Sequence, residues 1–436
     1  MTAVTTTGAA AFLGRYDGLR MRLPGARLDW VEALRDRAAN AFRASGFPTR
    51  RVEAWKYTDL GVVSGASFGE PLTRVDDALT LVPSANPRAV FVDGRYRPDL
   101  STLDGLAIEV QSLASALPGL EGWLGALATV EQHPLAALNG MLFEDGLVLD
   151  VPAGIDAGVM EMVQVATESE RAPAYHPRHL VRLGAGANLT LIESAIGPEG
   201  ARYLHNPVFE IEVAEGARMS HGRLQQEGHE GVFLSTVYAR VAAKGTYDNF
   251  TLNAGAKLAR NEIHVALNGP KAEAHMNGVQ MIGDGQHADT TTDLDHAAPD
   301  CSSRQTYKTV LAGRSRGVFQ GKIHVHRIAQ KTDGYQMNQA LLLSPEAEMD
   351  SKPQLEIYAD DVKCSHGATV GELNADHLFF LRSRGIPEAQ AKAILVEAFL
   401  TEAVEAVAEE PIRDALMRAV SGWWQRQGVA GGIEAA

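Results

Sequence analysis

The spacing of hydrophobic residues changes along the chain. Near the N-terminus, Val31, Leu34, Ala38 and Phe42 recur at helical spacing. This spacing predicts an amphipathic helix, and Gly46 supplies a residue at which it can end. We therefore expect the first part of the chain to be helical.

The long middle of the chain follows a different pattern. Between about Ala89 and Glu356, apolar and polar residues alternate in short stretches such as Leu189–Glu193, Phe209–Val213 and Lys322–His326. Alternation with a period of two predicts strands that bury one face. Gly-rich, polar segments separate these stretches and are typical of turns.

A weak internal repeat runs through this middle region. A turn residue, an alanine, any residue and then Leu or Met occur in that order around Ala187, Ala217, Ala274 and Ala347. The second gap between these alanines is near twice the first, but the third is not a clean multiple of it. Repeats of short strands and turns on this scale are typical of a parallel β-helix, in which each coil stacks on the one before. A β-sandwich also has many short strands and remains the alternative from the pattern alone.

Helical spacing returns after Gly371. Pro387 is well placed for the first turn of a helix. The apolar stripe of that helix consists of Ala391, Ile394, Leu395, Ala398 and Phe399. The pattern thus predicts three domains: an N-terminal helical domain (1–88), a mainly β core (89–370) and a C-terminal helical domain (371–436).

Composition and charge exclude several classes of partner. The 436-residue chain carries a formal net charge of −14, which is unfavourable for a nucleic-acid surface and for docking on anionic lipid. Its two cysteines, Cys301 and Cys364, cannot form a disulfide framework or a four-cysteine zinc site within one chain. No apolar run approaches the roughly 18 residues of a membrane helix, and Ala9–Leu13 is too short for a signal peptide. We therefore expect a cytoplasmic protein that binds neither nucleic acid nor membrane.

The common catalytic motifs are absent from the sequence. Gly317–Lys322 comes nearest to a phosphate-binding loop, but its glycines are too close together and Ile323 replaces the hydroxyl residue that would bind Mg²⁺. There is also no Gly-x-Ser-x-Gly elbow and no His-Glu-x-x-His helix. Any ATP hydrolysis in this system must therefore come from a partner.

Two segments rich in metal-binding side chains remain ambiguous. His324 and His326 are two positions apart on a predicted strand, so they share a face, but no third ligand is evident nearby in the sequence. A metal pair and an ordinary histidine pair both remain open. His287–His296 is rich in oxygen and nitrogen ligands but lacks the spacing of a calcium loop, and we interpret it as a polar loop.

Cys364 and His366 form the candidate site whose side chains are best suited to binding a metal. On a strand these side chains point the same way, and a thiolate beside an imidazole can hold a soft metal or an iron–sulfur species. Lys363 and His366 are expected to lower the pKa of the Cys364 thiol. A buried, inert cysteine beside a hydrogen-bonded histidine is the alternative. Two ligands do not complete an iron site, so a metal role requires ligands from another chain.

Several long motifs resemble the core of the SufB/SufD family of iron–sulfur cluster assembly proteins. They are Tyr307–Leu311, Arg316–Val325, Ala329–Asp333, Lys352–Tyr358 and Cys364–Thr369, and Glu53–Thr58 is similar to an N-terminal motif of the SufD branch. SufB proteins typically have a carboxylate directly after the motif histidine and more cysteines. Here Gly367 follows His366, so the resemblance is to the SufD branch.

The resemblance implies a fold and a set of partners. It implies a right-handed parallel β-helix flanked by N-terminal and C-terminal helical domains, in a complex of one SufB, two SufC ATPases and one SufD. The C-terminal helices would bind SufC, and the last coils would meet SufB. The contact residues on these helices would include Pro387, Ile394, Leu395, Ala398 and Phe399.

The resemblance also implies a role for the candidate site. His366 would share a transient iron–sulfur cluster or iron with SufB, and Cys364 is the weaker candidate for the same role. No cofactor would be bound stably. The chain itself would be a non-catalytic scaffold that helps SufB to form and release nascent clusters, with a part in iron acquisition.

Three other expectations stay open at this stage. A purely structural adaptor would bind SufB and SufC without touching metal. A β-helix enzyme acting on polysaccharide would need a pair of acidic catalytic residues, and no such pair is recognisable. In isolation, an exposed β-helix edge would favour a homodimer.

Overall fold

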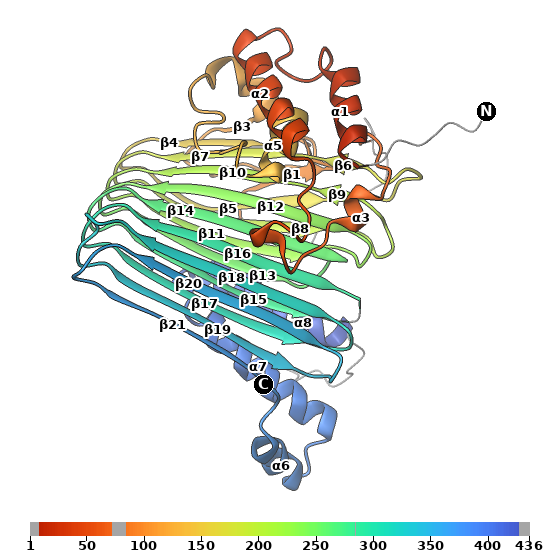
Figure 1. The fold of residues 1–436 in the computed structure, drawn as a ribbon, viewed down its shortest axis with the longest axis vertical. Helices are drawn as coiled ribbons and strands as arrows, with labels where there is room; N and C mark the ends of the chain where they lie inside the picture. The colour runs from red at the N-terminus through yellow and green to blue at the C-terminus, as the bar shows by residue number, and fades with distance from the viewer. Residues whose placement is uncertain (1–7, 72–83, 284, 427–436) are drawn as a thin grey trace.

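Two long sheets of mostly parallel strands form the body of the computed structural model, which describes residues 8–71, 84–283 and 285–426 (Figure 1). The first sheet contains, in spatial order, β2 (Arg95–Tyr96), β1 (Arg88–Val92), β5 (Asp156–Val165), β8 (Asn188–Ile196), β11 (Arg218–Gln226), β13 (Thr246–Asn253), β15 (Glu273–Ile282), β17 (Ser302–Leu311), β19 (Asp333–Leu342) and β21 (Lys363–Gly371). The second contains β20 (Glu348–Ile357), β18 (Arg316–Val325), β16 (His287–His296), β14 (Leu258–Leu267), β12 (Val232–Val241), β10 (Val208–Val213), β7 (Arg178–Leu183), β4 (Leu147–Val151) and β3 (Val110–Ser112), with the short β6 (Ala174–Tyr175) and β9 (Leu204–His205) beside it.

Successive strands of the chain alternate between the two sheets, so each coil contributes to both. Strands of neighbouring coils pair in parallel and in register, as Val232 with Leu258 and Arg316 with Glu348 illustrate. This topology is a parallel β-helix, which confirms the predicted fold class; a β-sandwich would pair its strands mainly antiparallel.

The predicted equivalence of the four alanines is only partly correct. Ala187 and Ala217 each precede the first residue of stacked strands, because Asn188 pairs with Arg218. Ala274, however, lies two positions further along its strand than these alanines, and Ala347 precedes β20 in the other sheet. The feature that repeats from coil to coil is therefore the register of the strands. Residues of many types occupy equivalent inward-facing positions in it.

The interpretation of His287–His296 as a loop is wrong, since this segment forms strand β16. Its neighbours β14 and β18 pair with it along the whole length and satisfy its backbone groups. Leu294 points into the apolar interior, whereas the buried Asp289 binds the buried Arg260. Polar side chains that find buried partners thus override the low strand propensity of the sequence.

Helices cover the N-terminal end of the β-helix (Figure 1). They are α1 (Gly8–Leu19), α2 (Asp29–Ser45), α4 (Leu113–Ala116), η2 (Leu117–Gly119) and α5 (Pro134–Leu142), whereas η1 (Glu53–Trp55) and α3 (Gly61–Ser64) lie beside later coils. The α2 helix ends at Gly46, as predicted, where φ is 60°. Helix α5 lies within the range that we assigned to the β core, yet Ala38, Leu138 and Met141 place it in one cluster with α2.

The Glu53–Thr58 segment attaches these helices to the second sheet. Trp55 is 3% exposed. The Cζ atom of the Arg260 guanidinium lies over the Trp55 ring, 3.8 Å from the ring centroid. Arg260 donates to the Ala54 carbonyl oxygen at 2.9 Å, and the Thr58 hydroxyl donates to Asp289. The motif therefore has a clear structural role, in which an aromatic ring and a buried cation join two parts of the chain.

Three helices follow the last coil: α6 (Ala375–Ser383), α7 (Glu388–Val404) and α8 (Glu410–Arg426). Asn374 caps α6 by accepting the backbone N–H groups of Asp376 and His377. Helices α7 and α8 pack on the outer face of the first sheet through one apolar cluster, and a Cβ on Gly222 would lie 2.6 Å from Ile412, so only glycine allows α8 to approach so closely. In the described ranges, no helix is both long and apolar enough to cross a membrane.

Buried histidines make the stability of this fold depend on pH. Burial lowers the pKa of His176 and His179 to about 3 and that of His296 to about 4, from an ordinary value of 6.5. Between those values the folded state binds fewer protons than the unfolded state. These histidines therefore contribute stability that is fully present above pH 6.5 and is lost as the pH falls toward 4.

We predict that the free energy of unfolding, measured by urea denaturation, falls between pH 7 and 5, with each buried histidine contributing about 1.4 kcal/mol per pH unit. His296→Gln removes one titrating group while keeping a polar partner for Ser303, whose hydroxyl lies 3.0 Å from Nε2. This variant should show a shallower pH dependence. His377→Gln on the exposed face of α6 is the control, and equal slopes for both variants would contradict the assignment.

We also predict that Trp55→Ala lowers the free energy of unfolding by about 3 kcal/mol, because it opens a cavity over a buried guanidinium. Urea denaturation followed by circular dichroism measures the loss. Lys56→Ala, at the exposed neighbouring position, should change stability by about 0.5 kcal/mol or less. Similar losses in both variants would mean that Trp55 does not anchor the N-terminal helices.

Candidate functional site at the open end of the β-helix

The two ends of the β-helix differ. At the N-terminal end, the antiparallel pairs β1–β2 and β3–β4 and the packed helices cover the first coils. At the other end, β20 and β21 are the last strands of their sheets, and no further strand pairs with them within the described residues. Pro353, which lacks a backbone N–H, lies in β20, where a strand with a free edge tolerates it. This end therefore offers two unpaired strand edges.

Cys364 and His366 lie on β21 in the columns of side chains that face the interior of the β-helix. Cys364 is the register partner of Gly334, which pairs with the buried Ser303. The Cys364 side chain packs beside the main interior cluster. The structure thus places both residues on the same side of the last strand, as the spacing predicted.

The His366 column is polar and runs into the interior. His366 is the register partner of Gln336, which pairs with Gln305. Both glutamines are fully buried, whereas His366 is exposed because no coil covers it. The Gln336 Oε1 atom is buried without a hydrogen-bond partner. His366 is therefore the exposed end of a polar column, and the atom beneath it still lacks a donor.

The predicted activation of the Cys364 thiol is wrong. Burial, with a smaller contribution from the Asp333 carboxylate, raises the pKa of this thiol, although the backbone N–H of Gly334 opposes the shift. Lys363 points to the other side of the strand and is exposed, so it cannot offset burial. At neutral pH the group is a thiol unless a metal or another cation displaces its proton. Cys301 is only 1% exposed, and burial raises the pKa of its thiol as well.

Several apolar side chains in or beside the last coil are exposed. They are Ile328, Ile357, Tyr358 and Val370, which are between 37% and 70% exposed. They lie in or directly beside the last coil, next to the unpaired edges of β20 and β21. Large apolar side chains beside open strand edges are typical of a surface that another chain covers.

The residues expected to contact a partner on α7 do not share one environment. Pro387 and Ala398 are exposed, and Ile394 and Leu395 are half-buried. The Phe399 ring packs on the chain itself, because the Lys308 ammonium lies 4.5 Å from its centroid. The residues that bury α7 against the first sheet are Val396, Leu400, Ala403 and Val404. Fewer residues of α7 are thus available to a partner than the apolar stripe of the sequence suggested.

Sequence reasoning missed the most exposed aromatic residues of the C-terminal region. Helix α6 has no buried residue and projects beyond the last coil (Figure 1). Phe379 is 74% and Phe380 53% exposed. The signal that could have revealed them is the run of four apolar residues Leu378–Leu381. Four consecutive residues of a helix point in different directions, so a helix on the surface cannot bury them all.

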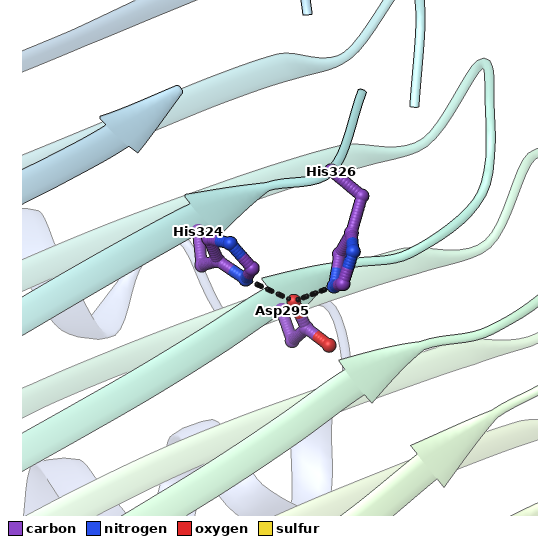
Figure 2. Close-up of side chains that lie close together, drawn as sticks. All are labelled: Asp295, His324 and His326. Atoms are coloured by element: carbon purple, nitrogen blue, oxygen red, sulfur yellow. Dashed lines mark hydrogen bonds and ion pairs between the residues drawn. The ribbon is translucent and has the colours of Figure 1, made fainter. Parts of the chain in front are cut away.

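His324 and His326 lie one strand from the open end, because β18 pairs with β20, and the His324 ring lies 5.5 Å from the ring of Tyr358. They project from the outer face of the second sheet, because the intervening Val325 is buried in the interior. Asp295 on β16 lies between them (Figure 2). Sequence spacing could not reveal this third ligand, because it comes from the preceding coil.

Comparisons with known proteins agree with this architecture. Residues 165–399 match the family described as SUF system FeS cluster assembly, SufBD core domain, and residues 9–84 match the SufBD protein N-terminal region. The chain is 34% identical to the iron–sulfur cluster assembly protein SufD of Escherichia coli, over 86% of this chain and 88% of that protein. It is 30% identical to the chloroplastic protein ABCI7 of Arabidopsis thaliana, over 90% of this chain and 86% of that protein. A SufBD family protein of Synechocystis is also 30% identical, over 89% of this chain and 90% of that protein. The chain therefore belongs to the SufB/SufD family of the SUF system of iron–sulfur cluster assembly, on its SufD branch.

Proposed function

We propose that this chain is a non-catalytic scaffold subunit of the SUF machinery. It docks a SufC-type ATPase through its C-terminal helices and meets a SufB-type subunit through the open end of the β-helix. There His366 helps to hold iron or a nascent iron–sulfur cluster as cargo. The observation that carries the proposal is the open end itself, which has two free strand edges, exposed apolar side chains and the exposed His366.

The partner at this end supplies what the last coil lacks. A second β-helix end pairs with free strand edges through backbone hydrogen bonds and covers the apolar side chains beside them. It also brings ligands toward His366 and Cys364, which supply only one imidazole and one half-buried thiol. A SufB-type chain satisfies both needs, because it shares the β-helix fold.

The C-terminal helices provide a mechanical connection between an ATPase and this end. Helix α7 packs on the outer face of the first sheet, where the Lys308 ammonium on β17 pairs with Glu402. Strand β17 pairs with β19, and β19 pairs with β21, which carries His366. A pull on α6 and α7 when the ATPase dimerises would therefore reach the cargo site through two strand pairings and shift the interface between two states.

The second candidate is a purely structural adaptor that joins SufB and SufC without touching metal. The raised pKa of the Cys364 thiol favours this alternative, because a protonated thiol is a poor metal ligand. Both candidates share the docking surfaces and differ only in the role of His366.

We predict that Phe379→Asp with Phe380→Asp weakens binding of a SufC-type ATPase by about 30-fold or more, because exposed aromatic residues anchor helical interfaces. Light scattering and titration calorimetry of the purified full-length chain with the ATPase measure the effect. These substitutions leave the core intact, since α6 has no buried residue, whereas removal of α7 and α8 would expose the apolar face of the first sheet.

Met21→Asp is the matched control, because Met21 is 73% exposed among the N-terminal helices at the other end of the molecule. It should leave binding unchanged. If the double variant also binds normally, the ATPase docks elsewhere, and the outward residues of α7 are tested next with Ala398→Arg.

We further predict that His366→Ala, in the complete complex with SufB and SufC, lowers the rate of cluster formation by about tenfold while the complex still assembles, since a lost ligand weakens the cargo site without removing the interface. Cluster absorbance during anaerobic reconstitution measures the rate, and light scattering measures assembly. His377→Ala on α6 is the control histidine. Normal cluster formation by His366→Ala would establish the adaptor instead.

A further inference from the structure

Asp295, His324 and His326 form a compact cluster on the outer face of the second sheet (Figure 2). The Nδ1 atom of His324 and the Nε2 atom of His326 each lie 2.8 Å from the same Asp295 carboxylate oxygen, Oδ1. Across residues 8–71, 84–283 and 285–426, this is the one place where three such ligand atoms lie within 4.8 Å of one another.

The β-helix register assembles this cluster. Asp295 and His324 are register partners on the adjacent strands β16 and β18, one coil apart. His326 directly follows β18 and returns to the same side as His324, since the residue between them points inward. Two of the three ligands are thus held on paired strands, and the backbone N–H of His326 donates to the His296 carbonyl oxygen at 3.0 Å, which holds the third in place.

The contacts within the cluster differ from those of an ordinary histidine–carboxylate pair. Two imidazoles converge on one carboxylate oxygen, and their ring centroids are only 4.4 Å apart. The His326 Nε2 atom is shielded from solvent yet has no partner with hydrogen-bond geometry, although Asp295 is near. An ion among the three atoms would satisfy this nitrogen as well as the carboxylate.

The surroundings allow an ion to enter. The side chains of His324, His326 and Asp295 are 26%, 43% and 36% exposed, so solvent reaches them. Asp295 and His324 also line an open groove of about 360 Å³ between the second sheet and the segment around His133. Glu356, the register partner of His324 on β20, brings a further carboxylate one strand away.

We propose that Asp295, His324 and His326 bind a divalent first-row transition-metal ion, of which Zn²⁺ and Fe²⁺ are the representatives. Two imidazoles and one carboxylate suit these ions, and three protein ligands leave open positions toward the groove for water or a small ligand. Ligand atoms around such an ion are about 3.3 Å apart, so each histidine nitrogen needs to move only about half an ångström away from the carboxylate oxygen.

This site is independent of the proposed cargo site. Cys364 and His366 face the interior from the first sheet, whereas the cluster lies on the outer face of the second sheet. The cluster therefore shares no ligand with the cargo site, and its three ligands all come from this chain. The isolated chain is the right material for a test.

The experiment titrates Co²⁺, whose visible absorption reports its ligands, into the full-length chain carrying Cys364→Ser and His366→Ala to silence the open end. We expect one ion per chain, displaced by Zn²⁺, with an absorption band of a nitrogen- and oxygen-ligated ion. Adding Asp295→Asn or His326→Gln to this background should weaken binding by about tenfold or more. Thermal midpoints without metal show that each variant is folded.

Asp248→Asn is the matched control, because Asp248 pairs with the single imidazole of His275 on the outer face of the first sheet. It should leave Co²⁺ binding unchanged. Absence of saturable binding, or equal weakening by Asp248→Asn and Asp295→Asn, would overturn the proposal and leave the cluster as a hydrogen-bonded group. Loss of SufC docking or of cluster formation in other variants has no bearing on this result.

Discussion

In-register stacking of parallel strands is the constraint on which the rest of the structure depends. No coil of this β-helix can satisfy its own backbone groups, so each requires the coil before it and the coil after it. The N-terminal coils meet this requirement with antiparallel strands and packed helices. For the last coil, with β20 and β21, no strand of the described ranges does so. An unmet requirement at one end is a physical reason for a partner, independent of any family resemblance.

The same register decides which side chains meet. Each coil returns the chain to the same sheet and places distant parts of the sequence side by side, as with Val232 and Leu258. It builds the buried polar column that ends at His366, and it brings Asp295 under His324. Both the interior column and the external cluster are therefore consequences of the same stacking.

The sequence predicted the parts of this structure that local pattern controls. Period-two alternation identified β8, β10 and β18, and the glycine at position 46 marked the end of α2. It failed where tertiary partners decide. The polar segment His287–His296 becomes a strand because Arg260 pairs with its buried Asp289 and neighbouring strands pair with its backbone. Asp295 belongs to this ligand-rich segment, but the sequence could not pair it with His324 and His326, because they lie one coil later. Likewise, Cys364 looked reactive beside Lys363, but burial dominates its pKa.

The outer faces of the two sheets differ in what covers them. Helices α7 and α8 cover the outer face of the first sheet, whose last strand carries His366, so force applied to these helices would act on the sheet that holds the proposed cargo site. The outer face of the second sheet is covered only near the N-terminal helices and stays open around Asp295, His324 and His326. The proposed metal cluster and the helices α7 and α8 therefore lie on opposite faces of the β-helix. The two faces are nevertheless linked within a single coil, because α7 contacts β17 and the next strand of the chain, β18, carries His324.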